Sequence, residues 1–381
     1  MKGFSVLDCH VHYALPISRE ALESALAAAG ADMANLVIVP DRGRISSVPD
    51  ALAYKHAHPH STYVFSSFDV SEYMRHKNAV GKKMKAFVKR MLVSGCDGVK
   101  IIEGKPDMRR MLPVPDFDAP VWEPFWAWAE ETGLPILWHV NDPEEFWDSE
   151  RIPEFAKKSG WFYGPETINN EEQYRQVLTV LERHPKLKII FAHMFFLSAQ
   201  LERLSSYLRL YENICVDLTP GIELYQSMSK TPEAARAFFE EFSDRILYGT
   251  DIGARAVISH KPLNEKENAQ RVYLCRTFLE HDGEFSVTMD GNFLMGEGEM
   301  KLFGLGLSDD SLKKIYRDNF LRLVGAPRRV NKANVLKECN RLRFMMKIMA
   351  RFDKNFVADF SAVDDVTAYF RKKTARTPKN G

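Results

Sequence analysis

Between residues 4 and 251, eight short apolar segments alternate with segments of helical composition, and this alternation constrains the fold more than any other feature. Strands that alternate with helices form parallel sheets, and near-continuous apolar runs are typical of strands covered on both faces. No Gly-x-Gly-x-x-Gly turn follows the first strand, so an open dinucleotide-binding sheet is disfavoured. Eight such units predict an α/β fold, a closed (β/α)8 TIM barrel. The predicted strands are residues 4–12, 34–39, 62–68, 98–102, 134–139, 187–193, 214–218 and 245–251.

The chain after the eighth predicted strand is less regular. Residues 252–307 are interrupted by glycines and predict a long loop plus a helix beside the last strand. Ser308 has the residue type of an N-cap and predicts a helix over 308–323. The remaining residues are basic and helical in composition. We therefore expect a barrel domain at 1–327 and a helical C-terminal extension with a ragged tail at 328–381.

Composition narrows the function classes. The 381 residues carry 52 basic and 51 acidic side chains, so no overall field recruits nucleic acid or an anionic membrane. The five scattered cysteines are typical of reduced core thiols. No apolar run has the length or flanks of a signal peptide or a membrane span. We expect a cytoplasmic protein that binds a small molecule rather than nucleic acid or membrane.

Histidines and one aspartate stand at the ends of the predicted strands. His10 and His12 end the first strand, His139 the fifth, His193 the sixth and Asp251 the eighth. The carboxyl ends of barrel strands meet at one mouth, where barrel enzymes have their active sites. Imidazole nitrogens and carboxylate oxygens are common ligands of zinc and similar divalent ions. The sequence therefore predicts a metal site at this mouth.

Other histidines lack this placement. His56, His58 and His60 lie between a helix and the third strand, and His184 lies before the sixth strand. Both positions face the opposite mouth, where residues serve stability rather than chemistry. We expect these four to be solvated loop residues.

Six motifs together resemble the amidohydrolase superfamily, and the closest branch is the amidohydrolase-2 group, which includes aminocarboxymuconate-semialdehyde decarboxylase. The resemblance covers about residues 4–325 and leaves the C-terminal extension outside. One departure is Met194-Phe195-Phe196, where the family usually has small, glycine-rich residues. The motifs are Asp-Cys-His-Val-His at 8–12, Gly-Val-Lys at 98–100, Pro-Ile-Leu-Trp-His at 135–139, Ile-Phe-Ala-His at 190–193, Tyr-Gly-Thr-Asp at 248–251 and Asn-Phe-Leu-Arg-Leu at 319–323.

The resemblance implies roles for the strand-end residues. His10, His12, His139 and Asp251 would hold one divalent ion, with Zn²⁺ as the first choice and Mn²⁺ or Fe²⁺ as alternatives. His193 would orient or deprotonate the water bound to this ion, and the second oxygen of Asp251 would accept a hydrogen bond from that water. Both residues would then be catalytic.

Three functions remain open at this stage. The first is a metal-dependent hydrolase, in which metal-activated water attacks an amide, ester or lactone of a small carboxylated compound. The second is a metal-dependent, non-oxidative decarboxylase of a carboxylated aromatic or muconate-like compound, with the same metal set. The third is a non-catalytic barrel that binds a metal or a ligand.

Three cations lie near the predicted mouth. Lys100 could be the carboxylated lysine that bridges two ions in binuclear relatives, or it could bind a substrate anion or reach out to solvent. Arg42 follows the second strand and Arg255 the eighth, although Arg255 could also be a surface residue. Arginine grips carboxylates through two hydrogen bonds, so these cations suggest a carboxylated substrate.

A tryptophan-rich segment bears on assembly. Trp122, Trp126 and Trp128 could form the interface of a homodimer, the commonest kind of oligomer. The same residues could instead pack a helix onto the barrel.

Overall fold

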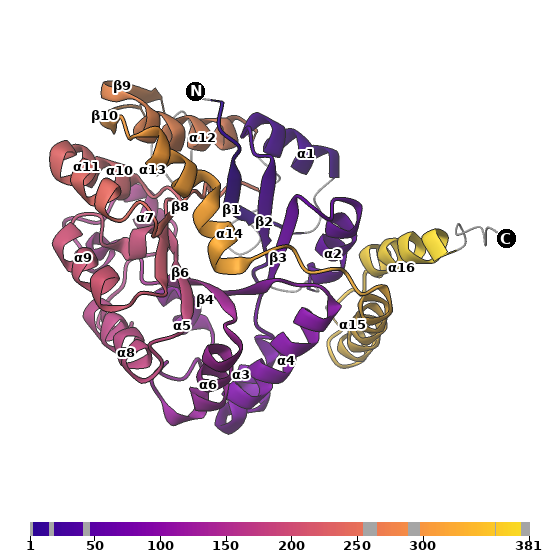
Figure 1. The fold of residues 1–381 in the computed structure, drawn as a ribbon. Coiled ribbons are helices and arrows are strands. Elements are labelled where there is room, and N and C mark those ends of the chain that lie inside the picture. Colours follow the sequence, from indigo (N-terminus) through magenta and orange to yellow (C-terminus); the bar gives the residue numbers. More distant parts are fainter. Residues whose placement is uncertain are drawn as a thin grey trace.

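The computed structural model describes residues 3–14, 19–40, 46–253, 265–288, 298–354 and 356–374. Eight parallel strands form one sheet in the order β1 to β8, and helices surround it (Figure 1). Backbone hydrogen bonds from Cys9 to Tyr248 (2.9 Å) and from His12 to Ile252 (2.8 Å) join β1 to the chain after β8. The predicted TIM barrel is therefore confirmed. The strands are β1 Leu7–His12, β2 Met33–Val37, β3 Thr62–Ser66, β4 Gly98–Gly104, β5 Pro135–Val140, β6 Lys188–Phe191, β7 Ile214–Asp217 and β8 Ile246–Leu247.

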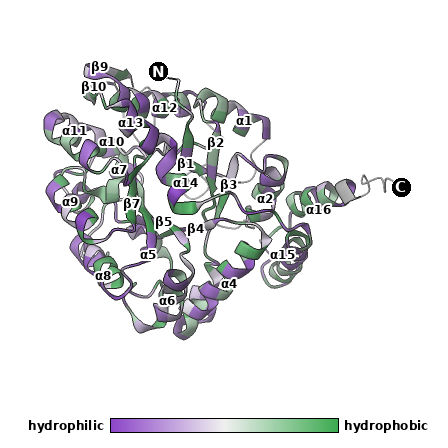
Figure 2. Cartoon of the chain, in the orientation of Figure 1, coloured by the Kyte–Doolittle hydropathy of each residue, from purple (hydrophilic) through white to green (hydrophobic). Residues whose placement is uncertain are grey.

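Helices connect the strands and cover the barrel, with hydrophobic residues concentrated on the strands inside them (Figure 2). Local signals set several helix ends: the Asn169 side chain accepts from the Glu171 amide at the start of α8, and Ser308 caps α13 as predicted. The helices are α1 Arg19–Ala28, α2 Val48–Ala57, α3 Ser71–Arg75, α4 Val80–Ser94, α5 Pro106–Met111, α6 Glu123–Thr132, α7 Glu154–Lys158, α8 Asn170–Arg183, α9 Leu201–Leu210, α10 Ile222–Ser229, α11 Pro232–Glu241, α12 Glu265–Glu280, α13 Asp309–Lys313, α14 Asn319–Val324, α15 Lys332–Phe352 and α16 Ser361–Thr374.

Helix α14 closes the end of the barrel opposite the predicted site. Its Phe320 ring packs against Tyr63 (ring centroids 5.0 Å apart) and Phe65 (6.2 Å), whose side chains fill the barrel interior. The Tyr63 hydroxyl donates to the carbonyl of Gly325 at 2.7 Å. The barrel is thus a packed core at this end, and chemistry is confined to the other mouth.

The tryptophans of the α6 region belong to the core. Trp122, Trp126 and Trp128 are all buried, and Trp126 stacks on Trp138 of β5 at 5.0 Å. They hold α6 against the barrel and offer no surface to a second copy of the chain. A homodimer stays a prediction, but these three tryptophans are already buried within one chain.

His184 corrects one expectation. It is 5% exposed rather than solvated, and its two ring nitrogens lie 3.2 Å from Glu123 and 3.2 Å from Glu130 of α6. His184 directly follows α8, and two acidic side chains of the neighbouring helix α6 contact it there. A sequence position in a loop therefore does not decide burial.

The irregular stretch contains more structure than predicted. The expected helix is present as α12, but an antiparallel hairpin follows it, formed by β9 Asp282–Thr288 and β10 Glu299–Leu305. Two of the glycines that suggested a loop, Gly283 and Gly304, lie opposite each other in this hairpin. At Gly304 a Cβ atom would lie 2.3 Å from the His281 carbonyl oxygen, so only glycine permits this approach.

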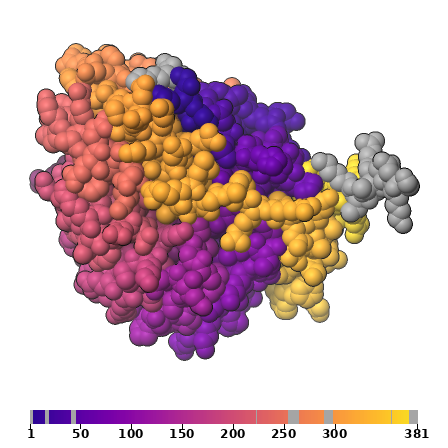
Figure 3. Space-filling model, viewed as in Figure 1, coloured from indigo at the N-terminus to yellow at the C-terminus, as the bar shows by residue number. Residues whose placement is uncertain are grey.

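The C-terminal extension is helical, as expected, and packs on the outside of the barrel (Figures 1 and 3). Arg90 of α4 pairs with Glu338 of α15 at 3.2 Å, and His56 of α2 contacts the Tyr369 hydroxyl of α16 at 3.0 Å. The division into two domains at residue 327 stays a prediction. Residues 375–381, which contain the expected ragged tail, lie outside the described residues.

None of the described helices has an apolar stretch long enough to cross a bilayer. All five cysteines are buried and free.

We predict that Asn319→Ala destabilises the barrel by about 1–3 kcal/mol. The Asn319 side-chain amide is buried and donates to the carbonyls of Ser243 (2.7 Å) and Ile246 (2.8 Å), so alanine leaves two buried acceptors without this donor. Urea unfolding measures the change, with Asn340→Ala on the exposed side of α15 as the control. A loss no larger than that of the control would contradict the role of Asn319.

Candidate metal centre

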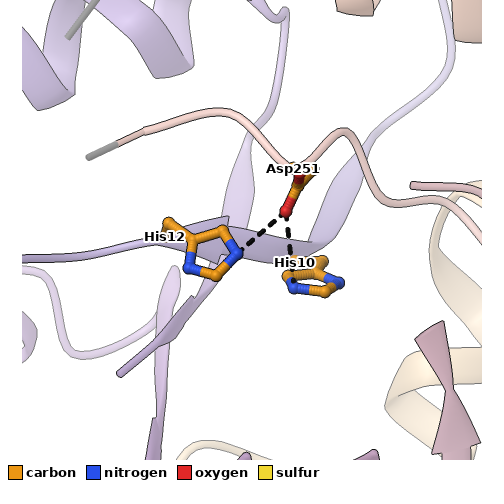
Figure 4. A group of neighbouring side chains, drawn as sticks. All are labelled: His10, His12 and Asp251. Carbon is orange, nitrogen blue, oxygen red and sulfur yellow. Dashed lines mark ion pairs between the residues drawn. The ribbon is translucent and has the colours of Figure 1, made fainter. Parts of the chain in front are cut away.

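Three of the predicted ligands lie together at the carboxyl ends of the strands. His10 and His12 are two residues apart in β1 and therefore face the same side. Nε2 of His12 lies 2.8 Å from Oδ1 of Asp251, and Nε2 of His10 lies 3.7 Å from the same oxygen (Figure 4). Among the described residues, one ligand atom from each of these three lies within 4.8 Å of the others.

Asp217, at the end of β7, orients His10. Its Oδ2 lies 2.9 Å from Nδ1 of His10, and both side chains are fully buried. Burial opposes ionisation of Asp217, but the neighbouring His10 outweighs it, so the pKa of the carboxyl lies below its usual range. A carboxylate can only accept, so Nδ1 carries the proton and Nε2 presents its lone pair to the site.

The residues after β6 form an unusual turn. His193, Met194, Phe195 and Phe196 all have positive φ angles between 53° and 57°. This left-handed conformation costs non-glycine residues roughly 1–2 kcal/mol each. Packing of the bulky side chains of the turn offsets this strain.

Specific contacts hold this turn. Met194 and Phe195 are buried, and Phe195 stacks on Phe191 at 3.9 Å. The His193 amide donates to Oδ1 of Asp217 at 2.8 Å. Asp217 thus fixes a histidine ring on one side and the strained turn on the other.

His193 forms part of the wall of a cavity of about 100 Å³ at this mouth. Its Nδ1 lies 3.0 Å from the carbonyl oxygen of Thr219, which can only accept, so Nδ1 carries the proton. Nε2 is then a proton acceptor. Burial and the nearby His139 lower the pKa of His193 to about 3, so the ring is neutral at physiological pH.

His139 lines the same cavity but stands apart from the compact group. Its ring lies 5.0 Å from that of His193, and its Nε2 lies 3.3 Å from Oδ1 of Asp142. Burial lowers the pKa of His139 to about 4. Asp142 also receives Lys105 at 2.6 Å and the Tyr163 hydroxyl. Metal binding by His139 stays a prediction.

Lys100 is buried at 1% exposure, which excludes the alternative in which it reaches out to solvent. Its Nζ lies 3.0 Å from Nε2 of His10, and burial lowers its pKa to about 8. Carboxylation and anion binding both remain open for this residue. Arg42 and Arg255 lie outside the described residues.

Arg271 of α12 was not anticipated from the sequence. It is fully buried, and its guanidinium lies 3.2 Å from Oδ2 of Asp251 and 3.0 Å from Glu267. The second oxygen of Asp251, expected to face water, therefore has a cationic partner. Burial opposes ionisation of Asp251, but His12 and Arg271 outweigh it and hold the pKa well below its usual range.

Sequence reasoning also missed Asp217 and the Lys105–Asp142 pair. Asp217 could have been found, because it ends a strand just as the histidines do. Arg271 follows no strand-end rule, since its position depends on how a distant helix packs. Lys105 directly follows β4, which extends beyond residue 102, where the predicted strand ended. Asp8 has a structural contact: it accepts from the Thr250 amide at 3.2 Å and so joins β1 to the chain after β8.

The donor set fits a divalent cation. With the proton of His10 on Nδ1, the Nε2 lone pair faces both Nζ of Lys100 at 3.0 Å and the carboxylate oxygen of Asp251 at 3.7 Å, an arrangement that suits a cation. A carboxylate behind a metal-binding imidazole is the usual second partner of such a ligand. The site therefore combines candidate ligands with the group that orients one of them.

A (β/α)8 barrel with two histidines and an aspartate at its catalytic mouth defines the class of protein. The family model described as amidohydrolase (Amidohydro_2) matches residues 88–326, and the chain belongs to this family. No curated protein matches the sequence at a significant level.

Two solved structures are similar in fold. An uncharacterised TIM-barrel protein from Bordetella bronchiseptica has 15% identity and a TM-score of 0.53, over 87% of this chain and 99% of that one. A putative amidohydrolase from Staphylococcus aureus has 17% identity and a TM-score of 0.50, over 84% and 99%. These likenesses support the barrel and say nothing of the reaction.

We predict that Asp217→Asn lowers zinc affinity roughly 10–100-fold, as loss of a group behind a ligand does. If the asparagine side chain keeps its oxygen toward the backbone amide of His193, its NH₂ group points at the Nδ1 proton of His10. Two hydrogen-bond donors then face each other. Competition with a chromophoric chelator measures the affinity. Asp244→Asn, at a side chain 56% exposed, is the matched control. Equal affinities in the two variants would remove Asp217 from the site.

Proposed function

We propose that this chain is a metal-dependent enzyme of the amidohydrolase-2 group that acts on a small carboxylated compound. The observation that carries the proposal is the position of His193, a neutral proton acceptor held by Thr219 and Asp217 in the wall of the cavity that His12 and Asp251 also line. A barrel that only bound a ligand would have no use for a strained turn that fixes one imidazole.

The ligands would be His10, His12 and Asp251, with His139 as the fourth. Zn²⁺ suits imidazole and carboxylate ligands best, and Mn²⁺ and Fe²⁺ are the alternatives. When bound, such an ion acts as a Lewis acid and makes water a stronger acid. Lys100 beside His10 is the residue on which a second ion would depend.

The tautomer of His193 supports hydrolysis of an amide, ester or lactone. Its Nε2 can take a proton from water or from the substrate, because Nδ1 already donates to Thr219. The same nitrogen can return the proton to the product. This cycle needs no change of tautomer at His193.

Decarboxylation is the second candidate, and the aromatic walls of the cavity favour it because they suit a carboxylated aromatic ring. Arg271 and His12 keep Asp251 ionised, so a proton for the leaving amine of a hydrolysis would have to come from His193. A decarboxylase has no such leaving group and needs a proton only for the carbon that loses carbon dioxide. The same metal set would serve both reactions.

The residues that line the cavity indicate the chemical character of the substrate. Phe146, Phe155, Trp161 and Phe196 line it, so an aromatic or other apolar ring fits these walls. Lys105, the lysine of the described lining, is already paired with Asp142. The proposal therefore assigns the substrate carboxylate to Arg42, Arg255 or Lys100.

The five free, buried cysteines suit the reducing cytoplasm, which we propose as the location.

A product assay tests the proposal. Metal-loaded protein is offered a panel of lactones and aromatic acids, and released carbon dioxide is measured against ring-opened product. Ring opening supports the hydrolase and carbon dioxide the decarboxylase. Turnover that survives complete removal of metal would contradict both.

We predict that His193→Asn keeps the metal but loses roughly 10²–10⁴-fold in turnover, because asparagine cannot act as a proton acceptor at this position. Metal content and kcat are measured on the same preparation. His281→Asn, at an exposed histidine of the hairpin region, is the control. Loss of metal from His193→Asn would instead make His193 a ligand.

A further inference from the structure

A second cavity, about 520 Å³ in volume, lies between α15 and the barrel. Its walls include Met345, Met346 and Met349 of α15 and Met108 and Met111 of α5. Helix α15 is seen nearly end-on in Figure 1, so it runs along the barrel axis from the closed end toward the catalytic mouth. We call this cavity the α15 pocket.

The α15 pocket adjoins the catalytic cavity. Val39, just after β2, lines both. Phe68 after β3 and Met108 after β4 also line the α15 pocket, so it opens among the loops at the carboxyl ends of the strands. Val39 packs with Ile102 and Met108 in one small apolar cluster between the two cavities.

The two volumes differ in what they can hold. Ligand pockets in proteins usually measure about 300–1,000 Å³. The catalytic cavity, at about 100 Å³, has room for a single ring and little more, whereas the α15 pocket falls within the usual range.

The lining of the α15 pocket indicates an uncharged, apolar occupant. Two charged side chains belong to the described lining, and both have partners: Arg341 donates to Glu338 at 2.6 Å, and Asp69 accepts from the Ser71 amide at 3.2 Å. Methionine side chains are flexible and polarisable, so a methionine-lined wall adapts to apolar groups of different shape.

We propose that the α15 pocket binds an apolar arm of the substrate, which passes Val39 while its polar head lies at the metal centre. The proposal rests on the proposed function and narrows the substrate to compounds with an extended alkyl or aryl substituent. Helix α15 lies outside the residues 88–326 that match the family model.

Alkyl hydroxamic acids test the arm, because the hydroxamate head chelates divalent metals and the chain length can be varied. Calorimetric titration of the zinc-loaded full chain compares acetohydroxamate with hydroxamates of up to ten carbons. We expect affinity to rise about fourfold per methylene once the chain passes Val39.

Substitutions that fill the α15 pocket test whether the gain in affinity with chain length arises there. Met345→Trp and Met111→Trp fill the pocket from opposite walls at half-buried positions. We expect both to abolish the dependence on chain length while acetohydroxamate binds as before, which also shows that they are folded. Ile348→Trp, one turn along α15 at a side chain 41% exposed and outside the described lining, should leave the dependence intact.

The outcomes separate the two proposals. Failure of acetohydroxamate to bind would overturn the metal centre alone, and titration with 1-decanol, which has no chelating head, then tests the pocket. Decanol that binds the wild type and Ile348→Trp but neither filled variant supports the pocket. Acetohydroxamate binding without any gain from chain length, a gain that persists in both filled variants, or no decanol binding overturns it.

Discussion

The carboxylate of Asp217 is the contact on which the site depends. One oxygen holds the ring of His10 at 2.9 Å, and the other accepts from the His193 amide at 2.8 Å. The side chain is fully buried, and the Thr219 hydroxyl also donates to it at 2.6 Å, so several donors together compensate its charge. A single group thus sets the tautomer of a proposed metal ligand and stabilises the strained turn that carries the proposed base.

Much of this arrangement could be predicted from the sequence because the barrel ties chain order to position. The eight strands follow from apolar runs, and His10, His12 and Asp251 meet because each stands at or just beyond the end of a run. The same rule reaches Asp217 at the end of β7. It could not reach Arg271, whose approach to Asp251 depends on how a distant helix packs.

The backbone conformation was harder to predict from the sequence than the positions of the strands. Four consecutive non-glycine residues from His193 to Phe196 adopt left-handed angles, against their local preference, because packing and Asp217 outweigh the strain. The hairpin of β9 and β10 escaped prediction for a related reason. Its glycines signal a break in the sequence, but Gly304 is required by close contact with His281.

The central claim is that this mouth holds one divalent ion, and elemental analysis of protein purified without chelator tests it most directly. The account predicts about one ion per chain, zinc before manganese or iron, and loss of that ion in a double variant, His10→Ala with His12→Ala. Protein that is folded yet metal-free, and that takes up no zinc, manganese or iron on titration, would contradict the account. Two ions per chain with a carbamate on Lys100 would contradict its mononuclear form.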